Sequence, residues 1–305
     1  ENNLSGSASN SLEDIVLVGN NRSVGERGDH SVVLGSADTR TYNTTPNVVT
    51  IGHNANVQDH GGNTSGGGDV AIGHSSFIEN YINQSGSIAL GQKAHVQNMT
   101  GTSESGFTLG QTTYSPDASG VKVPDDPSKV AEGVAIGENS YARTGSLMVG
   151  THKYIGDMGD TTVDTSDAGK MADANQQINA TTLGTNSFSN GAFSTVTGAI
   201  ISGDYSAGKW RNFGASVTGS LNSIESKTAS AADAGVATNV MGTANRTYNT
   251  NGALVLGAGN EVTNSLSAIT TPTSNTTSVK DLADKLRAAV KDGKGGGAVV
   301  AVGNA

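Results

Sequence analysis

Residues 133–150 read GVAIGENSYARTGSLMVG and hold two copies of one short phrase. The first copy, GVAIG, ends at Gly137, and the second, GSLMVG, ends at Gly150, 13 residues further along the chain. A glycine at this point suits a backbone with positive φ, or a place where no Cβ fits against a neighbouring backbone. We therefore expect each phrase to be a short strand that its glycine ends.

The residues between the two glycines predict a second strand. Val134 and Ile136 point to one face of an extended chain, and the methyl group of Ala135 points to the other. After the glycine come two polar residues, the small Ser140 and a second strand candidate at 141–143. One phrase with its downstream half thus predicts a pair of short strands.

The phrase recurs along the whole chain. Fourteen copies end at Gly19, Gly35, Gly52, Gly73, Gly91, Gly110, Gly137, Gly150, Gly184, Gly198, Gly219, Gly242, Gly257 and Gly303. The downstream half recurs with a small residue at the third position after the glycine and an apolar one at the fifth, as in Ala55 with Val57, Ser76 with Ile78, Ala94 with Val96 and Ser140 with Ala142. Such repeats are the signature of solenoids, in which each coil packs only on its neighbours.

Composition agrees with a thin, repetitive core. Only 34% of the 305 residues are hydrophobic and 4% are aromatic, whereas 42 are glycine, so a thick globular core is not expected. The net charge of −9 offers no basic field for nucleic acid. The absence of cysteine excludes disulfides and thiolate metal sites.

The spacing of the phrases defines the organisation of the chain. Residues 1–14 are expected to be a lead-in segment, and 15–303 a β-roll interrupted by excursions at about 114–132, 151–179, 199–213 and 263–297. The excursion at 114–132 holds three prolines and is predicted to be an irregular loop.

The last excursion contains one predicted helix, 278–292. Ser278 is a plausible N-cap and Gly293 a C-terminal stop. An apolar stripe is formed by Val279, Leu282, Leu286, Ala289 and Val290. That stripe needs a partner, either the flank of the roll or the same helix in another subunit.

Several phrases are apolar on both faces, which predicts an interface. If one face fills the coil, a second apolar stripe faces outward, and we expect it to hold Ala71, Ala89, Ala135, Val33, Val49 and Val255. A continuous exposed stripe of this kind marks an interaction surface. Cyclic association of identical chains would bury it most simply.

The phrases 87–91 (SIALG) and 133–137 (GVAIG), each followed by a polar pair and a small residue, resemble the YadA-like head repeats of trimeric autotransporter adhesins. The resemblance covers nearly all of 15–303. It implies a left-handed parallel β-roll assembled as a homotrimer, whose structural repeat residues here are Gly52, Gly73, Gly91, Gly137, Gly150, Val134 and Ile136. It also implies Sec-dependent export, and display on a stalk with a C-terminal β-barrel anchor in the outer membrane of a diderm bacterium. The neck, stalk and anchor would lie outside this sequence, which departs from the family pattern in its irregular spacing and long excursions.

Catalytic, metal and cofactor motifs are absent from the sequence. His53 and His74, each one residue after a phrase glycine, could stack on successive coils and share a metal. Exposed turn residues are the preferred interpretation, because no third ligand is defined. A Ca²⁺ site could be built by Asp157, Asp160, Asp164 and Asp167, but a solvated loop is favoured because their spacing matches no EF-hand.

The ligand-binding candidates lie in the excursions. Trp210 is flanked by Lys209 and Arg211, and tryptophan and arginine are enriched in binding hot spots. Packing of Trp210 against the roll is the alternative. Lys153 and Tyr154 are further candidates.

These features favour a cell-surface adhesin head, not an enzyme, that attaches to host matrix, host cells or other bacteria and so serves virulence and biofilm formation. A structural spacer whose ligand site lies elsewhere in the full-length protein is the alternative. A hexapeptide-type acyltransferase is disfavoured, because it requires a strict six-residue period.

Overall fold

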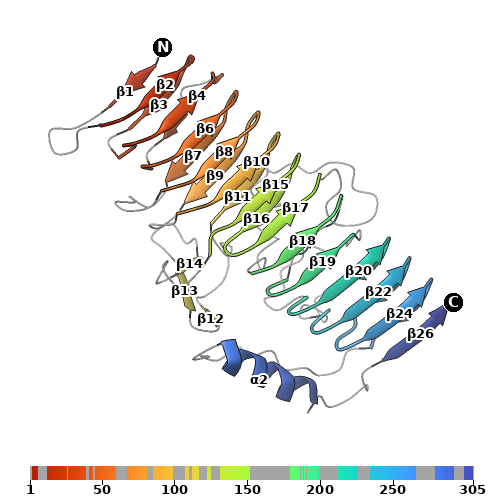
Figure 1. Cartoon of the computed structure of the whole chain (residues 1–305). Helices are drawn as coiled ribbons and strands as arrows, with labels where there is room; N and C mark the ends of the chain where they lie inside the picture. Colours follow the sequence, from red (N-terminus) through yellow and green to blue (C-terminus); the bar gives the residue numbers. More distant parts are fainter. Residues whose placement is uncertain are drawn as a thin grey trace. The chain divides into compact units, whose positions relative to one another are not determined.

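The computed structural model describes residues 2–5, 12–25, 27–38, 41–43, 45–59, 67–80, 85–98, 107–109, 112–116, 122–124, 131–151, 179–185, 187, 189, 191–198, 212–225, 234–265, 279–291 and 299–304. The chain forms two compact units. The first consists of Glu1–Met99 with Val130–Thr151, and the second of Thr100–Lys129 with His152–Ala305. Most described elements are β-strands (Figure 1).

In the first unit each copy of the repeated phrase supplies one strand of a parallel sheet, which we call the phrase sheet. Its order is β2 (Val16–Val18), β4 (Val32–Leu34), β6 (Val49–Ile51), β8 (Val70–Ile72), β10 (Ile88–Leu90), β15 (Val134–Ile136) and β17 (Leu147–Val149). Neighbouring strands pair position by position, so that Ala71, Ala89 and Ala135 lie side by side. The predicted parallel stacking of phrases is confirmed.

Between phrase strands the chain crosses to companion strands, which form separate parallel sheets. One companion sheet holds β1 (Asn3–Leu4), β3 (Arg22–Val24) and β5 (Thr41–Asn43); the other holds β7 (Asn56–Asp59), β9 (Phe77–Asn80), β11 (His95–Gln97) and β16 (Tyr141–Arg143). The predicted strand at 141–143 is therefore present. The lead-in segment also contributes, because β1 pairs with β3 and the Asn2 side chain donates to the Gly19 carbonyl at 2.8 Å.

The second unit repeats this architecture. Its phrase strands are β18 (Thr181–Leu183), β19 (Thr195–Thr197), β20 (Ser216–Ser220), β22 (Asn239–Thr243), β24 (Leu254–Ala258) and β26 (Val300–Asn304). Its companion strands are β21 (Ser223–Glu225), β23 (Arg246–Tyr248) and β25 (Glu261–Thr263), and all pair in parallel. The coils that begin at β20, β22 and β24 therefore again consist of a phrase strand and the companion strand that follows it.

The phrase ending at Gly110 departs from the repeat. Residues Phe107–Leu109 form β12, which pairs antiparallel with β13 (Thr112–Pro116), and β13 pairs antiparallel with β14 (Lys122–Pro124). The phrase sheet passes directly from β10 to β15. Our prediction of an irregular loop at 114–132 is therefore wrong for these strands. Pro116 is the last residue of β13 and Pro124 the last of β14. At the end of a strand a missing backbone N–H disturbs the hydrogen-bond ladder least.

Apolar and small polar side chains fill the coil interior. Ala71, Ala89 and Ala135 on the phrase strands are fully buried. The companion strands contribute the equally buried Ile78, Val96 and Ala142, the apolar fifth positions of the repeat. The small third positions, such as Ser140, are also fully buried.

This arrangement reverses the two faces that we predicted. Ala71, Ala89, Ala135, Val33 and Val255 were expected to point outward, yet all five are 0% exposed. Of the six residues in that prediction, Val49 alone lies on the outer side of its strand, where it is half-buried. The two strands of a coil are separated only by a short turn, so the space between them is narrow and encloses the middle residue of each phrase strand. This residue is alanine in β8, β10 and β15, but it is Val33 in β4 and Met148 in β17. The residues on either side of it face outward.

In the second unit, asparagines replace small residues at the third position. Asn222, Asn245 and Asn260 form a ladder along the stack. The Asn245 amide donates to the Gly257 carbonyl at 2.7 Å and to Asn222 Oδ1 at 3.0 Å. Asn245 Oδ1 in turn accepts from Asn260 Nδ2 at 2.9 Å. Each coil is thus tied to the next through buried or half-buried amides.

The predicted helix at 278–292 is confirmed as α2 (Val279–Lys291). The Leu286 Cδ2 atom lies 3.5 Å from the point that a Cβ at Gly214 would occupy, so this part of the apolar stripe packs on the same chain. No helix in the described part of the chain is long and apolar enough to cross a membrane.

Candidate interaction surfaces

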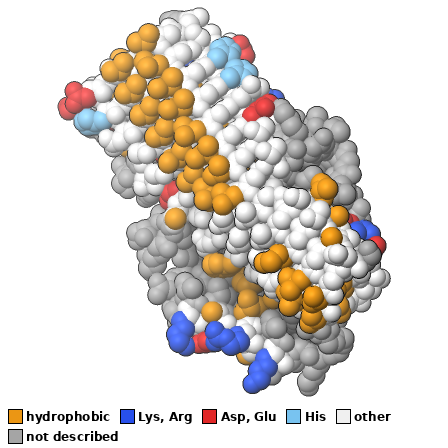
Figure 2. Space-filling view, turned by 45° about the vertical axis from the view of Figure 1, so that its right-hand side comes forward, with side chains coloured by type: hydrophobic (Ala, Val, Ile, Leu, Met, Phe, Trp, Pro, Cys, Tyr) orange, Lys and Arg blue, Asp and Glu red, His pale blue; other side chains and the backbone are white. Residues whose placement is uncertain are grey.

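The outer face of the phrase sheet in the first unit is a continuous aliphatic surface. In-register pairing places its outward residues in two rows, one of Val16, Val32, Val49, Val70, Ile88, Val134 and Leu147, the other of Val18, Leu34, Ile51, Ile72, Leu90, Ile136 and Val149. Figure 2 shows hydrophobic side chains gathered in a long band on the surface. Neither row contains a charged residue. We call this surface the aliphatic face.

The corresponding face of the second unit is mixed. One row holds Thr181, Thr195, Ser216, Asn239, Leu254 and Val300, and the other Leu183, Thr197, Thr218, Met241, Leu256 and Val302. Met241 is 55% exposed and Val302 69%. These rows also lack charge, although six of their twelve residues are threonine, serine or asparagine.

A polar and aromatic cluster occupies the outer side of the companion strands β9, β11 and β16. His95 Nε2 lies 2.6 Å from Glu79 Oε2, and its ring stacks on Phe77 at 5.2 Å and meets Tyr141 edge-on at 5.4 Å. The Arg143 Nε atom donates to the Tyr141 hydroxyl at 2.6 Å. Burial raises the pKa of Tyr141, so its hydroxyl stays protonated. The cluster joins three coils by side-chain contacts.

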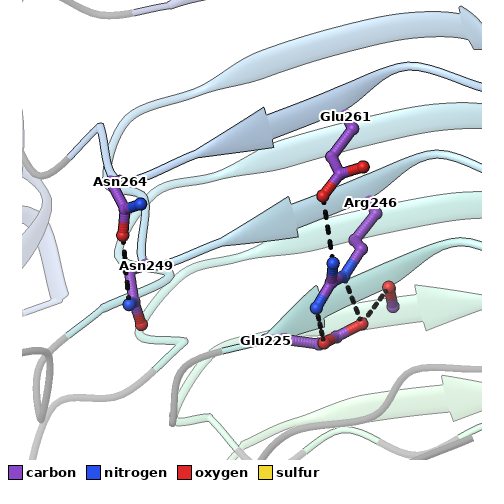
Figure 3. Close-up of polar contacts among 6 residues, drawn as sticks. Glu225, Arg246, Asn249, Glu261 and Asn264 are labelled. Carbon is purple, nitrogen blue, oxygen red and sulfur yellow. Dashed lines mark hydrogen bonds and ion pairs between the residues drawn. The ribbon is translucent and has the colours of Figure 1, made fainter. Parts of the chain in front are cut away.

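A charged row occupies the companion sheet of the second unit (Figure 3). Arg246 lies between two carboxylates, with Nη2 2.8 Å from Glu225 Oε2 and Nη1 3.0 Å from Glu261 Oε1. Its hydrogen bond to Glu225 raises the pKa of Arg246, so the guanidinium stays charged. Because the row joins β21, β23 and β25, it ties consecutive coils together. Nearby, Asn249 donates to Asn264 Oδ1 at 3.3 Å.

His53 and His74 stack as the sequence suggested. Their rings lie 5.5 Å apart at an interplanar angle of 7°, and His53 Nε2 lies 3.0 Å from Asp38 Oδ1. Hydrogen bonds from Asn54 and His53 lower the pKa of Asp38, which keeps it ionised. Both histidines lie at the surface. Among the described residues no three His, Asp or Glu side chains are placed to hold a metal ion.

The ligand-binding candidates chosen from the sequence are not covered by the structure. Lys209, Trp210, Arg211, Lys153 and Tyr154 all lie outside the described residues. The acidic residues Asp157, Asp160, Asp164 and Asp167 lie outside them as well. Whether any of these groups binds a ligand stays a prediction.

Several buried ionisable groups, Arg143 above among them, were missed by sequence reasoning. Arg22 is fully buried, and its guanidinium donates to the Ala55 carbonyl and, at 3.2 Å, to Thr50 Oγ1. Burial lowers the pKa of Arg22 to about 10, so it remains charged at neutral pH. No pattern in the sequence distinguishes it from an exposed arginine.

A pair of acidic residues was also missed. Asp69 and Glu132 lie just before the phrase strands β8 and β15. The Asp69 carboxylate is fully buried and accepts from the Ser87 amide at 2.8 Å and from Asn80 Nδ2 at 2.9 Å. Asn98 joins the same network, since it donates to Ser87 Oγ at 2.7 Å. Glu132 lies near Asp69, and its Oε2 atom is buried without a hydrogen-bond partner. Burial, with a smaller contribution from the Asp69 charge, raises the pKa of Glu132 to about 8.

Glu132→Gln is expected to make the protein more stable at alkaline pH. A carboxyl group whose pKa is higher in the folded than in the unfolded protein stabilises the native state at low pH. This contribution is complete below the unfolded-state pKa, near 4.5, and is lost as the pH rises through the folded-state pKa of about 8. At pH 9 the variant should therefore gain about 2–4 kcal/mol, since one pKa unit corresponds to about 1.4 kcal/mol. At pH 4 the two proteins should be similar. Urea denaturation at both pH values measures this difference.

Glu13→Gln is the matched control, because Glu13 is exposed. It should leave the pH dependence of the parent unchanged. Equal stability of Glu132→Gln and the parent at pH 9 would show that the Glu132 carboxylate is solvated in the folded protein.

Comparison with known proteins yields no relative. No family model matches the chain, and neither a curated protein nor a solved structure matches it.

Proposed function

We propose that this chain is the head of a homotrimeric bacterial surface adhesin that attaches to host matrix, host cells or other bacteria. In this proposal the head is a left-handed parallel β-roll, exported and displayed on the outer membrane of a diderm bacterium. The resemblance of the phrases to YadA-like head repeats supports it, and so do the in-register parallel coils. The single observation that carries it is the aliphatic face.

A second copy of the chain is the partner that best fits the aliphatic face. The face carries no charge and repeats the same residue types from coil to coil, so it is complementary to itself. With strands ~4.8 Å apart, its seven strands extend for roughly 29 Å, and a soluble monomer rarely exposes an apolar band of that size. Cyclic association of three copies would enclose the aliphatic faces around a common axis.

The excursions would then be the parts of the chain available for ligands. Loops on a rigid scaffold are where binding residues concentrate. Three copies would present each loop three times, and such multivalency raises avidity by orders of magnitude even when each contact is weak.

The test begins with the mass of the purified protein by light scattering, followed by saturation binding to collagen, fibronectin, laminin, epithelial cells and co-resident bacteria. A trimer with saturable binding to one of these supports the proposal. A monomer overturns the assembly. A trimer that binds nothing favours the structural spacer.

Loop variants locate the binding site. Replacing 152–178 or 199–211 by a short linker spares the buried Asn212 and Phe213, which the structure places at the end of the third excursion. Trp210→Ala and Tyr154→Ala are the point-variant counterparts. Loss of binding with an intact trimer would assign recognition to that excursion.

A further inference from the structure

The helix α2 carries the largest group of basic side chains in the described part of the chain. It holds four lysine and arginine residues in 13 positions, whereas no described strand holds more than one. Figure 2 shows basic side chains gathered at one part of the surface. The whole chain has a net charge of −9, so most of the molecule repels a polyanion. An anionic partner would therefore be attracted to α2.

Three of the four basic residues lie on one exposed side of the helix. Lys280, Arg287 and Lys291 follow one another at i, i+7 and i+11, a spacing that places them on one face, and Asp284 lies among them. The Lys280 side chain is 85% exposed and that of Arg287 72%. Lys291 is exposed as well. We call these three basic residues the basic stripe.

The apolar side of α2 faces away from the basic stripe. Leu286 belongs to that apolar side, and it packs near Gly214 of the same chain. This contact holds the basic stripe toward solvent. A helix that binds a membrane surface buries its apolar side among the lipids, and here Leu286 is already in contact with protein. The exposed surface of α2 therefore offers charge, which suits a soluble polyanion better than a lipid surface.

Asp284 neutralises only part of the basic stripe. Its carboxylate forms ion pairs with both Lys280 and Arg287. Hydrogen bonds from these two cations lower the pKa of Asp284, so it is ionised at neutral pH. Two cations and one carboxylate leave one positive charge, and Lys291 adds a second. The fourth basic residue, Lys285, lies outside the stripe, 3.1 Å from the Asp281 carboxylate.

We propose that the basic stripe of α2 binds a linear sulfated glycan of the host extracellular matrix. The inference rests on the proposed adhesion function and names a ligand class for it. Sulfate groups recur along such a glycan, and the stripe extends for about 16 Å, since each residue of a helix advances it by about 1.5 Å. Several sulfates of one glycan could therefore meet the cations in turn. Arginine pairs with an oxyanion through its planar fork, and lysine through a point charge.

Each copy would bind such a glycan weakly, because exposed ion pairs are individually weak and are screened by salt. In the proposed trimer one particle would carry three basic stripes, and a surface dense in glycans could engage more than one of them. Binding should therefore be measurable at low ionic strength and fall steeply as salt is added, as for other polyanions.

Binding of the purified protein to immobilised heparin, with desulfated heparin as the counterpart, tests this inference. The parent should bind heparin at low salt and should not bind the desulfated form. Lys280→Gln/Arg287→Gln/Lys291→Gln should lower the apparent affinity at least about tenfold, because the stripe loses its three cations. Glutamine is a good helix former, so α2 should persist, and far-ultraviolet circular dichroism checks that the fold is unchanged.

Asp284→Asn changes the charge of the stripe in the opposite direction. It removes the one carboxylate of this face, so the apparent affinity for heparin should rise about threefold. Lys285→Gln is the matched control, because it removes a positive charge from the same helix but from a residue paired with Asp281 outside the stripe. Its affinity should stay within about twofold of the parent.

The outcomes separate this inference from the proposed function. A parent that binds heparin and its desulfated form equally, or a triple variant that binds like the parent, overturns the glycan site. A trimer that binds another member of the adhesion panel, or anionic lipid vesicles, but not heparin overturns it as well and leaves the trimer intact. A monomeric parent that binds heparin through the basic stripe overturns the proposed trimer and supports the glycan site.

Discussion

Gly137→Ala is expected to destabilise the first unit by about 3 kcal/mol or more, the range of severe backbone and packing defects. Gly137 has φ of +124°, and a Cβ built there would lie 2.3 Å from the carbonyl oxygen of Gly150 on the next coil. No side-chain rotation relieves this overlap, because the backbone fixes the position of the Cβ and the atom that it meets is a backbone carbonyl oxygen. The coils would have to separate at this point, with loss of parallel hydrogen bonds. Guanidinium denaturation followed by circular dichroism measures the loss.

Gly303→Ala is the matched control for this substitution. Gly303 occupies the same position in its phrase, with φ of +135°, but nothing lies within 4 Å of a Cβ built there. It should therefore incur only the backbone strain, about 1–2 kcal/mol. If both variants lost the same stability, the close approach between coils would not be the reason for the repeated glycine.

The second large effect is expected from charge placed on the aliphatic face. Ile88→Lys/Ile136→Lys puts one ammonium group into each outward row. In the proposed trimer these groups would be enclosed without partners, and an uncompensated buried charge costs about 3–5 kcal/mol. The dissociation constant for assembly should rise at least about a thousandfold, since each 1.4 kcal/mol is a factor of ten. Analytical ultracentrifugation over a concentration series measures the change.

Gln92→Lys is the control for charge, because Gln92 is exposed in the turn after a phrase glycine. It should leave assembly unchanged. The far-ultraviolet circular dichroism spectrum of the double variant should match that of the parent, since Ile88 and Ile136 face away from the coil interior. A folded double variant that associates like the parent would exclude the aliphatic face as the interface.

The same double variant also tests the link between assembly and adhesion. If adhesion depends on multivalency, a folded monomer should retain the specificity of the parent but lose most of its apparent affinity. Retention of full affinity by the monomer would assign binding to a single strong site.

The sequence by itself determined the parallel repeat, because the phrase is a local pattern that recurs along the chain. Every copy except the one ending at Gly110 forms a strand that pairs in parallel with its neighbours. The phrase glycines identified the ends of the strands in the first unit, but the prediction was wrong for β20, β22, β24 and β26, which each continue one residue past the glycine. The small third and apolar fifth positions identified the companion strands. Helix α2 was also predictable from its local periodicity and capping residues.

Other features depended on the tertiary structure. Alternation separates Ala135 from Val134 and Ile136 but does not say which face is interior. That choice follows from how the two strands of a coil pack on each other, which buries Ala135 and Ala142 completely and leaves Val134 and Ile136 on the outer side. The phrase at Gly110 reads like the others, yet β12 pairs with the following hairpin because a nearby antiparallel partner was available.

The candidate surfaces divide in the same way. The outward rows could be located once the interior face was known, since they follow from position within each phrase. The burial of Arg22 and of Glu132 Oε2 could not be predicted, because burial depends on what neighbouring coils place around a side chain. A repeated local pattern therefore determined the strands of this protein, and packing between coils decided which faces and charges are buried.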